Sequence, residues 1–173
     1  PPIWQERGVN YGGINLLLWI WPLMFVYGAL GHFLNISNDL IIRLLFYFPA
    51  ILLALYGPWK LAKYLKKAPL VCFFASFFYT FNTYFLLLID GGQVGVALAY
   101  GAFPLVLYFL KKVIDNPSLK EFVRPTVAIF VLSIFDPRFV IIALATCFLW
   151  FVFECFQDKS NFKFSRLAVF PYL

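Results

Sequence analysis

The stretch IDGGQVGVALAYGAFPL, residues 89–105, joins two long apolar runs through a short polar break. Asp90, Gly91, Gly92 and Gln93 form that break. Glycine adopts backbone angles that are closed to other residues, so the break predicts a tight turn between two helices. Two interpretations of the four residues stay open. They form only a turn where the chain leaves a membrane, or they also line a site there.

The composition around this stretch is that of a membrane protein. Of the 173 residues, 63% are hydrophobic, 22% are aromatic and only 13% are charged. A soluble domain of this size needs a larger polar share to cover its surface. The sequence therefore predicts an all-α fold, a polytopic transmembrane helix bundle with about five to six membrane segments.

The apolar runs define the predicted segments. They cover residues 14–34, 40–57, 69–89, 94–110, 122–135 and 139–156. The run 122–135 is short, because at about 1.5 Å per residue it reaches about 21 Å of a core about 30 Å thick. It either extends through the preceding SLKEF or enters the bilayer only partway. The run 14–34 either crosses the bilayer or lies on its outer surface as an amphipathic helix.

No repeat or soluble domain interrupts these runs. We therefore expect one transmembrane domain over residues 1–173, with an outer-loop or interfacial region at 1–37 and membrane helices over 38–173. The chain starts without methionine, and a new apolar run begins at its end, RLAVFPYL. Both features predict further membrane segments beyond at least one end.

Lysine and arginine concentrate in alternate breaks, which sets the predicted orientation. The basic breaks are assigned to the cytoplasm: 58–68, 111–123 and 157–167. The breaks that each carry an aspartate are assigned to the outside of the cytoplasmic membrane: 35–39, 90–93 and 136–138. The net charge of +6 is then an insertion signal and a contact for lipid headgroups. The lipid bilayer is the expected partner, and nucleic acid is not.

Three polar positions within or beside the helices are candidate functional residues. Asn82 lies mid-segment, where it either bonds to a neighbouring helix or lines a polar cavity. Asp136 precedes Pro137 and opens a turn or caps a helix. Asp136 and Arg138 together also form a candidate site for a phosphate or a metal ion. One histidine and three scattered cysteines argue against a His- or Cys-based metal centre.

The order of these segments resembles a known family. RGVNYGG (7–13) precedes an apolar run, FNTYFLLLIDGGQVGVALAYGAFPLVLYFL (81–110) follows later, and SIFDPRFVIIAL (133–144) comes after it. This pattern resembles the membrane core of polytopic glycosyltransferases of the GT-C superfamily. The similar members are of the arabinofuranosyltransferase type and the lipoteichoic-acid glycosylating type.

The resemblance implies an activity and a set of site residues. It implies transfer of a sugar from a polyprenyl-phosphate donor to a glycan or lipid acceptor on the outer face of the membrane. In such enzymes an acid in the first outer loop acts as a base or binds a divalent cation, and no other cofactor is implied. That loop falls at or before residue 1, so the catalytic acid can lie outside this chain. The candidate acids are Asp90, Asp136 and Glu6. The candidate substrate-binding residues are Arg138, Arg7, Gly91, Gly92, Gln93 and Asn82.

Two other functions stay open. A transporter or flippase-like protein usually places ionisable groups near the bilayer midplane and contains broken helices. Here the acids lie at the predicted membrane faces, which favours the enzyme. In a non-catalytic membrane subunit, Asp90 and Asp136 would be turn residues only.

Overall fold

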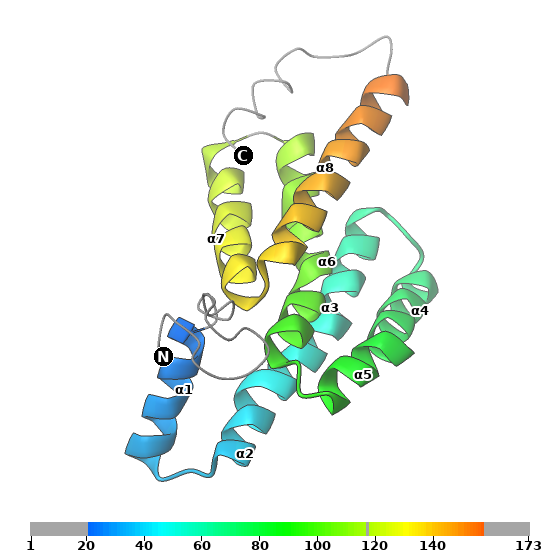
Figure 1. The fold of residues 1–173 in the computed structure, drawn as a ribbon. Coiled ribbons are helices and arrows are strands. Elements are labelled where there is room, and N and C mark those ends of the chain that lie inside the picture. The colour runs from blue at the N-terminus through cyan, green and yellow to red at the C-terminus, as the bar shows by residue number, and fades with distance from the viewer. Residues whose placement is uncertain (1–20, 117, 158–173) are drawn as a thin grey trace, which may run out of the picture.

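The computed structural model describes residues 21–116 and 118–157, and their regular structure is helical throughout (Figure 1). The elements are α1 (Trp21–Leu34), α2 (Asn38–Ile42), the π-helical turn η2 (Arg43–Tyr47), α3 (Phe48–Tyr64), α4 (Pro69–Thr80), α5 (Thr83–Asp90), α6 (Val94–Asp115), α7 (Leu119–Phe135) and α8 (Pro137–Gln157). The predicted all-α helical bundle is confirmed.

Three stretches of helix in the described residues are long and apolar enough to cross a membrane: Asp39–Tyr64, Pro69–Asp90 and Val94–Asp115. Two shorter apolar helices are Met24–Leu34 and Pro137–Phe153. Much of the surface is also apolar. One face of α4, for example, exposes Phe73, Phe74, Phe77 and Phe78. Such a surface suits a lipid environment, because a patch of this kind is rarely left open to water.

Two predicted boundaries differ from the structure. The sequence predicts an end at residue 57, before Pro58, yet α3 continues to Tyr64. A proline inside a helix leaves one carbonyl without its partner. Here Gly57 and Pro58 are buried, and a Cβ built on Gly57 would lie 3.3 Å from the Cβ of Pro104, so this part of α3 packs closely on α6. Likewise, the predicted end at residue 110 is wrong, because α6 runs on to Asp115.

The two segments with open alternatives behave differently. The short run 122–135 extends at its start, because α7 begins at Leu119 and the Ser118 hydroxyl accepts a hydrogen bond from the Glu121 backbone N–H. Its 17 residues span about 25 Å. Of the run 14–34, α1 covers Trp21–Leu34. Residues 14–20 lie outside the described residues, so both interpretations of that run stay open.

The centre of the bundle is α6, which packs against α3 on one side and against α7 and α8 on the other. The contact with α3 is close because small residues meet there. A Cβ atom built on Gly101 would lie 2.5 Å from the backbone oxygen of Ala50. Around this contact lies a buried hydrophobic cluster that includes Ala50, Phe46, Phe85 and Leu98. Small residues therefore bring α3 and α6 together, as expected for helices that pack in lipid.

The membrane-length stretches Asp39–Tyr64, Pro69–Asp90 and Val94–Asp115 run in alternating directions, and α7 and α8 reverse again, so most connections lie at two ends of the bundle (Figure 1). In that view the α1–α2 and α5–α6 connections lie toward the lower end, the α7–α8 connection lies at the lower ends of those two helices, and the α3–α4 connection lies at the upper end of α3. The aspartate-bearing and lysine-rich connections that alternate in the sequence are thus separated in space. We call the end with the 35–37, 91–93 and α7–α8 connections the aspartate end, and the end with the α3–α4 and α6–α7 connections the lysine end.

Candidate functional site

The connection between α5 and α6 is the tight turn that the sequence predicts. The Gly91 N–H donates to the Leu87 carbonyl and the Gln93 N–H to the Leu88 carbonyl, both at 2.9 Å. Gly92 has a φ of 65°, a left-handed conformation that favours glycine. The side chain of Asp90 is exposed, and it has no hydrogen-bond or ion-pair partner among the residues that the structure describes. Its carboxylate is therefore accessible at the aspartate end.

Asp136 is placed very differently, although it lies at the same end. It is only 1% exposed and separates α7 from α8. Its Oδ1 accepts a hydrogen bond from the Arg138 backbone N–H at 2.9 Å, which caps the start of α8. The Arg138 guanidinium pairs with the same carboxylate, with Nη2 2.6 Å from Oδ2. The predicted turn or cap is confirmed.

This pairing assigns different chemistry to the two side chains. The Asp136 carboxylate is buried and already accepts several hydrogen bonds, so its geometry is that of an orienting group. The Arg138 side chain is 71% exposed, and part of its guanidinium faces outward. An exposed guanidinium held in place by a buried carboxylate can bind an anion such as a phosphate.

Asn82 lies at a break that divides one membrane-length stretch into α4 and α5. Its Oδ1 accepts from the Phe85 N–H at 2.9 Å and caps α5, and its Nδ2 donates to the Tyr79 carbonyl and to the Tyr100 hydroxyl, each at 2.6 Å. The predicted bond to a neighbouring helix is confirmed. The break itself was not predicted. Asparagine caps helices better than it continues them, which accounts for its position there.

Tyr79 and Tyr100 were missed by the sequence analysis. Their rings stack with centroids 4.4 Å apart, and the Tyr79 hydroxyl donates to the Tyr100 carbonyl at 2.8 Å. The Tyr100 hydroxyl donates to the Tyr79 carbonyl at 3.1 Å. Tyrosine in place of phenylalanine inside an apolar run is the signal that was available, because a buried hydroxyl needs a partner. Together with Asn82, these two residues form a polar cluster between α4 and α6.

The lysine end contains ion pairs that the sequence analysis did not predict, although it assigned Lys111 and Lys112 to a basic connection. Lys111 of α6 is only 7% exposed and lies 2.5 Å from the carboxylate of Asp115, which also accepts a 2.7 Å hydrogen bond from the Tyr64 hydroxyl of α3. The Lys111 amino group also lies 5.3 Å from the centre of the Trp150 ring of α8. This network ties three helices together.

A second ion pair at this end joins α6 to α7. Lys112 contacts Glu121 at 2.9 Å, and Arg124 contacts the same carboxylate at 3.3 Å. Glu121 precedes the apolar run 122–135. The hydrogen bond from Lys112 and the nearby charge of Arg124 lower the pKa of the Glu121 carboxyl below its usual value.

The predicted site residues are thus only partly brought together. Asp136 and Arg138 form an ion pair, and Asp90 shares its turn with Gly91, Gly92 and Gln93. No hydrogen bond or ion pair joins the two groups within residues 21–116 and 118–157. Glu6 and Arg7 lie outside the described residues.

In the same ranges, no three side chains of His, Cys, Asp or Glu gather closely enough to hold a metal ion. A divalent cation at Asp90 would therefore need ligands from elsewhere.

No protein-family model, curated protein or solved structure matches this chain.

Proposed function

We propose that this chain belongs to the membrane core of a GT-C-type glycosyltransferase, with the lysine end facing the cytoplasm. The enzyme would transfer a sugar from a polyprenyl-phosphate donor to a glycan or lipid acceptor at the outer face of the cytoplasmic membrane. One observation supports this most directly: Asp90, exposed at the end of α5, and Arg138, exposed at the start of α8, both lie beside connections of the aspartate end.

The proposed reaction assigns one role to each group. The Asp90 carboxylate takes the proton of the acceptor hydroxyl, whose oxygen forms a bond to the anomeric carbon of the sugar. The bond between that carbon and the phosphate oxygen breaks, and the electron pair leaves with the polyprenyl phosphate. Arg138 stabilises the departing phosphate, and Asp136 is a positioning residue that orients Arg138.

Other groups supplement these roles in the proposal. The acceptor side of Asp90 is lined by Gly91, Gly92 and Gln93. The polar cluster at Asn82 supports α5, the helix that ends at Asp90. A divalent cation, if used, would bind Asp90 together with ligands outside the described residues. Glu6 and Arg7 remain candidates for that part of the site.

The proposal is tested by measuring sugar transfer by the full-length protein in lipid vesicles. We expect Asp90→Asn to lower the rate by about 100-fold or more, as the loss of a general base does. Arg138→Gln should lower it as well, while Asp39→Asn and Arg43→Gln, which change exposed residues of the same kinds in α2 and η2, should not. Unchanged transfer in Asp90→Asn, Asp136→Asn and Arg138→Gln would overturn the proposal.

A second candidate function is passage of a lipid-linked substrate, as in a transporter or flippase. The observation that favours it is the break between α4 and α5, where Asn82, Tyr79 and Tyr100 form a polar cluster inside a membrane-length stretch. A flipping assay in vesicles separates the two. Transport that is lost in Asn82→Ala and kept in Asp90→Asn favours the transporter. If the wild type shows neither sugar transfer nor flipping, the remaining interpretation is a non-catalytic membrane subunit.

A further inference from the structure

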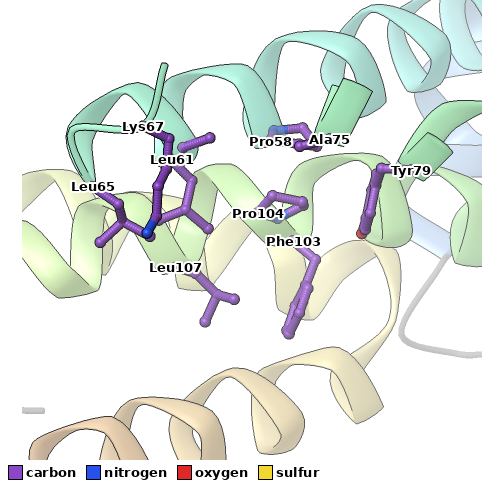
Figure 2. Close-up of a pocket in the computed structure, with 10 residues that line it drawn as sticks. Pro58, Leu61, Leu65, Lys67, Ala75, Tyr79, Phe103, Pro104 and Leu107 are labelled. Carbon is purple, nitrogen blue, oxygen red and sulfur yellow. The ribbon is translucent and has the colours of Figure 1, made fainter. Parts of the chain in front are cut away.

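An apolar groove of about 290 Å³ lies between α3, α4 and α6 (Figure 2). Its lining includes Pro58, Leu61, Leu65, Tyr79 and Leu107, with Lys67 as the charged member. Figure 2 shows the Lys67 amino group beside Leu65 at one end of the groove and Tyr79 at the other. The groove therefore extends from the polar cluster at Tyr79 to the lysine end of the bundle.

The basic residues around the end of α3, of which Lys67 lines the groove, have no ion-pair partner among residues 21–116 and 118–157. Lys60, Lys63, Lys66 and Lys67 lie on or next to the end of α3, and none of them forms an ion pair with another described residue. The neighbouring connection is different, because Lys111 and Lys112 each pair with a carboxylate there. A concentration of positive charge beside an apolar groove is complementary to a ligand with an anionic head and a hydrocarbon tail.

We propose that this groove binds one anionic phospholipid from the leaflet at the lysine end. An acyl chain lies along Pro58, Leu61 and Leu107, and the phosphate group contacts Lys67. From Leu65 to Pro58 the helix rises about 10 Å, which accommodates part of one acyl chain. The hydrocarbon would fill this apolar groove, and the phosphate would supply the negative charge that no described residue places beside Lys67. This inference is independent of the proposed function, because Leu65 and Lys67 of the groove lie at the α3–α4 connection, whereas Asp90 and Arg138 lie at the α5–α6 and α7–α8 connections.

The headgroup part is tested by native mass spectrometry of the full-length protein. Phosphatidylglycerol and phosphatidylcholine with identical acyl chains are titrated, and the preference for the anionic lipid is measured. Lys67→Gln should lower this preference by about fivefold, since one basic residue near an anionic headgroup has about that effect. Lys60→Gln is the matched control, because Lys60 stacks over Tyr56 and is not part of the groove lining. Equal binding of both lipids by the wild type, or equal losses in the two variants, would refute the assignment.

The groove part is tested by filling it. Ala75→Phe places a ring in the groove from α4 and should abolish tight phosphatidylglycerol binding, whereas Ala145→Phe makes the same change on an exposed position of α8 and should not. Leu107→Trp fills the groove from α6 and gives a second reading if Ala75→Phe does not fold. Wild-type binding in a folded groove variant contradicts the proposal. The proposal is also contradicted if polyprenyl phosphate binds in the groove and phosphatidylglycerol does not displace it.

Discussion

Replacing Gly101 by alanine is the sharpest test of the α3–α6 contact. The added Cβ would lie 2.5 Å from the backbone oxygen of Ala50, about 0.9 Å short of the 3.4 Å at which ordinary contact begins. A backbone atom cannot rotate away as a side chain does, so the two helices must separate. Overpacking of this kind costs about 1–3 kcal/mol, and the gain of about 1 kcal/mol from alanine in a helix offsets part of it. The net effect is then a loss of up to about 2 kcal/mol.

The control for this prediction is Gly28→Ala. Gly28 also lies inside a helix, but a Cβ added there meets nothing within 4 Å, so only the gain in helix propensity applies. Reversible unfolding in mixed detergent micelles, followed by circular dichroism, measures both variants against the wild type. Gly101→Ala should unfold at a lower denaturant fraction and Gly28→Ala at the same or a higher one. A Gly101→Ala protein as stable as Gly28→Ala would show that the two helices do not approach as closely as the 2.5 Å distance indicates.

Three further predictions concern single residues. Asn82→Ala removes the cap of α5 and the hydrogen bond to Tyr100, so it should lower the unfolding free energy by about 1–3 kcal/mol in the same assay. The control is Thr83→Ala, a change at the exposed neighbouring position, which should cost less than about 1 kcal/mol. Gly92→Ala has open space around it but a φ of 65°, so strain alone should cost about 1–2 kcal/mol, and Gly92→Asn should recover much of it. The pKa of Glu121 is lowered in the folded protein, so its ion pairs stabilise the protein above the usual value of 4.5 and stop doing so as the pH falls through the lower, folded pKa. Acidification in this range should therefore lower the melting temperature of the wild type more than that of Glu121→Gln, and equal shifts would contradict the ion-pair geometry.

Much of the fold could be predicted because its determinants are local. Apolar runs of membrane length, the double glycine at 91–92 and an aspartate before Pro137 each act within a few residues, and the structure contains the corresponding helices, turn and cap. The helix ends were less predictable. Whether Pro58 stops a helix depends on the packing of Gly57 and Pro58 against α6, and nothing in the sequence near them states that α6 is their neighbour.

The candidate site shows the same division. The sequence identified Asp90, Asp136 and Arg138 as polar residues in or beside connections, but it offered no reason to prefer Asp90 over Asp136 as the catalytic acid. The structure separates them, since one carboxylate is exposed and the other is buried under a guanidinium. Burial depends on how α7 and α8 pack, so two similar aspartates in similar turns acquire different chemistry.

The sequence by itself predicted the long apolar helices and the alternation of basic and aspartate-bearing connections, because hydropathy and charge are summed over consecutive residues. Only the tertiary structure decided which polar groups meet. The network of Lys111, Asp115 and Tyr64 and the cluster of Asn82, Tyr79 and Tyr100 each join helices that are far apart in the chain. The groove at Lys67 is likewise formed by three helices. Such contacts depend on the rotation and crossing of packed helices, and a linear pattern does not specify these.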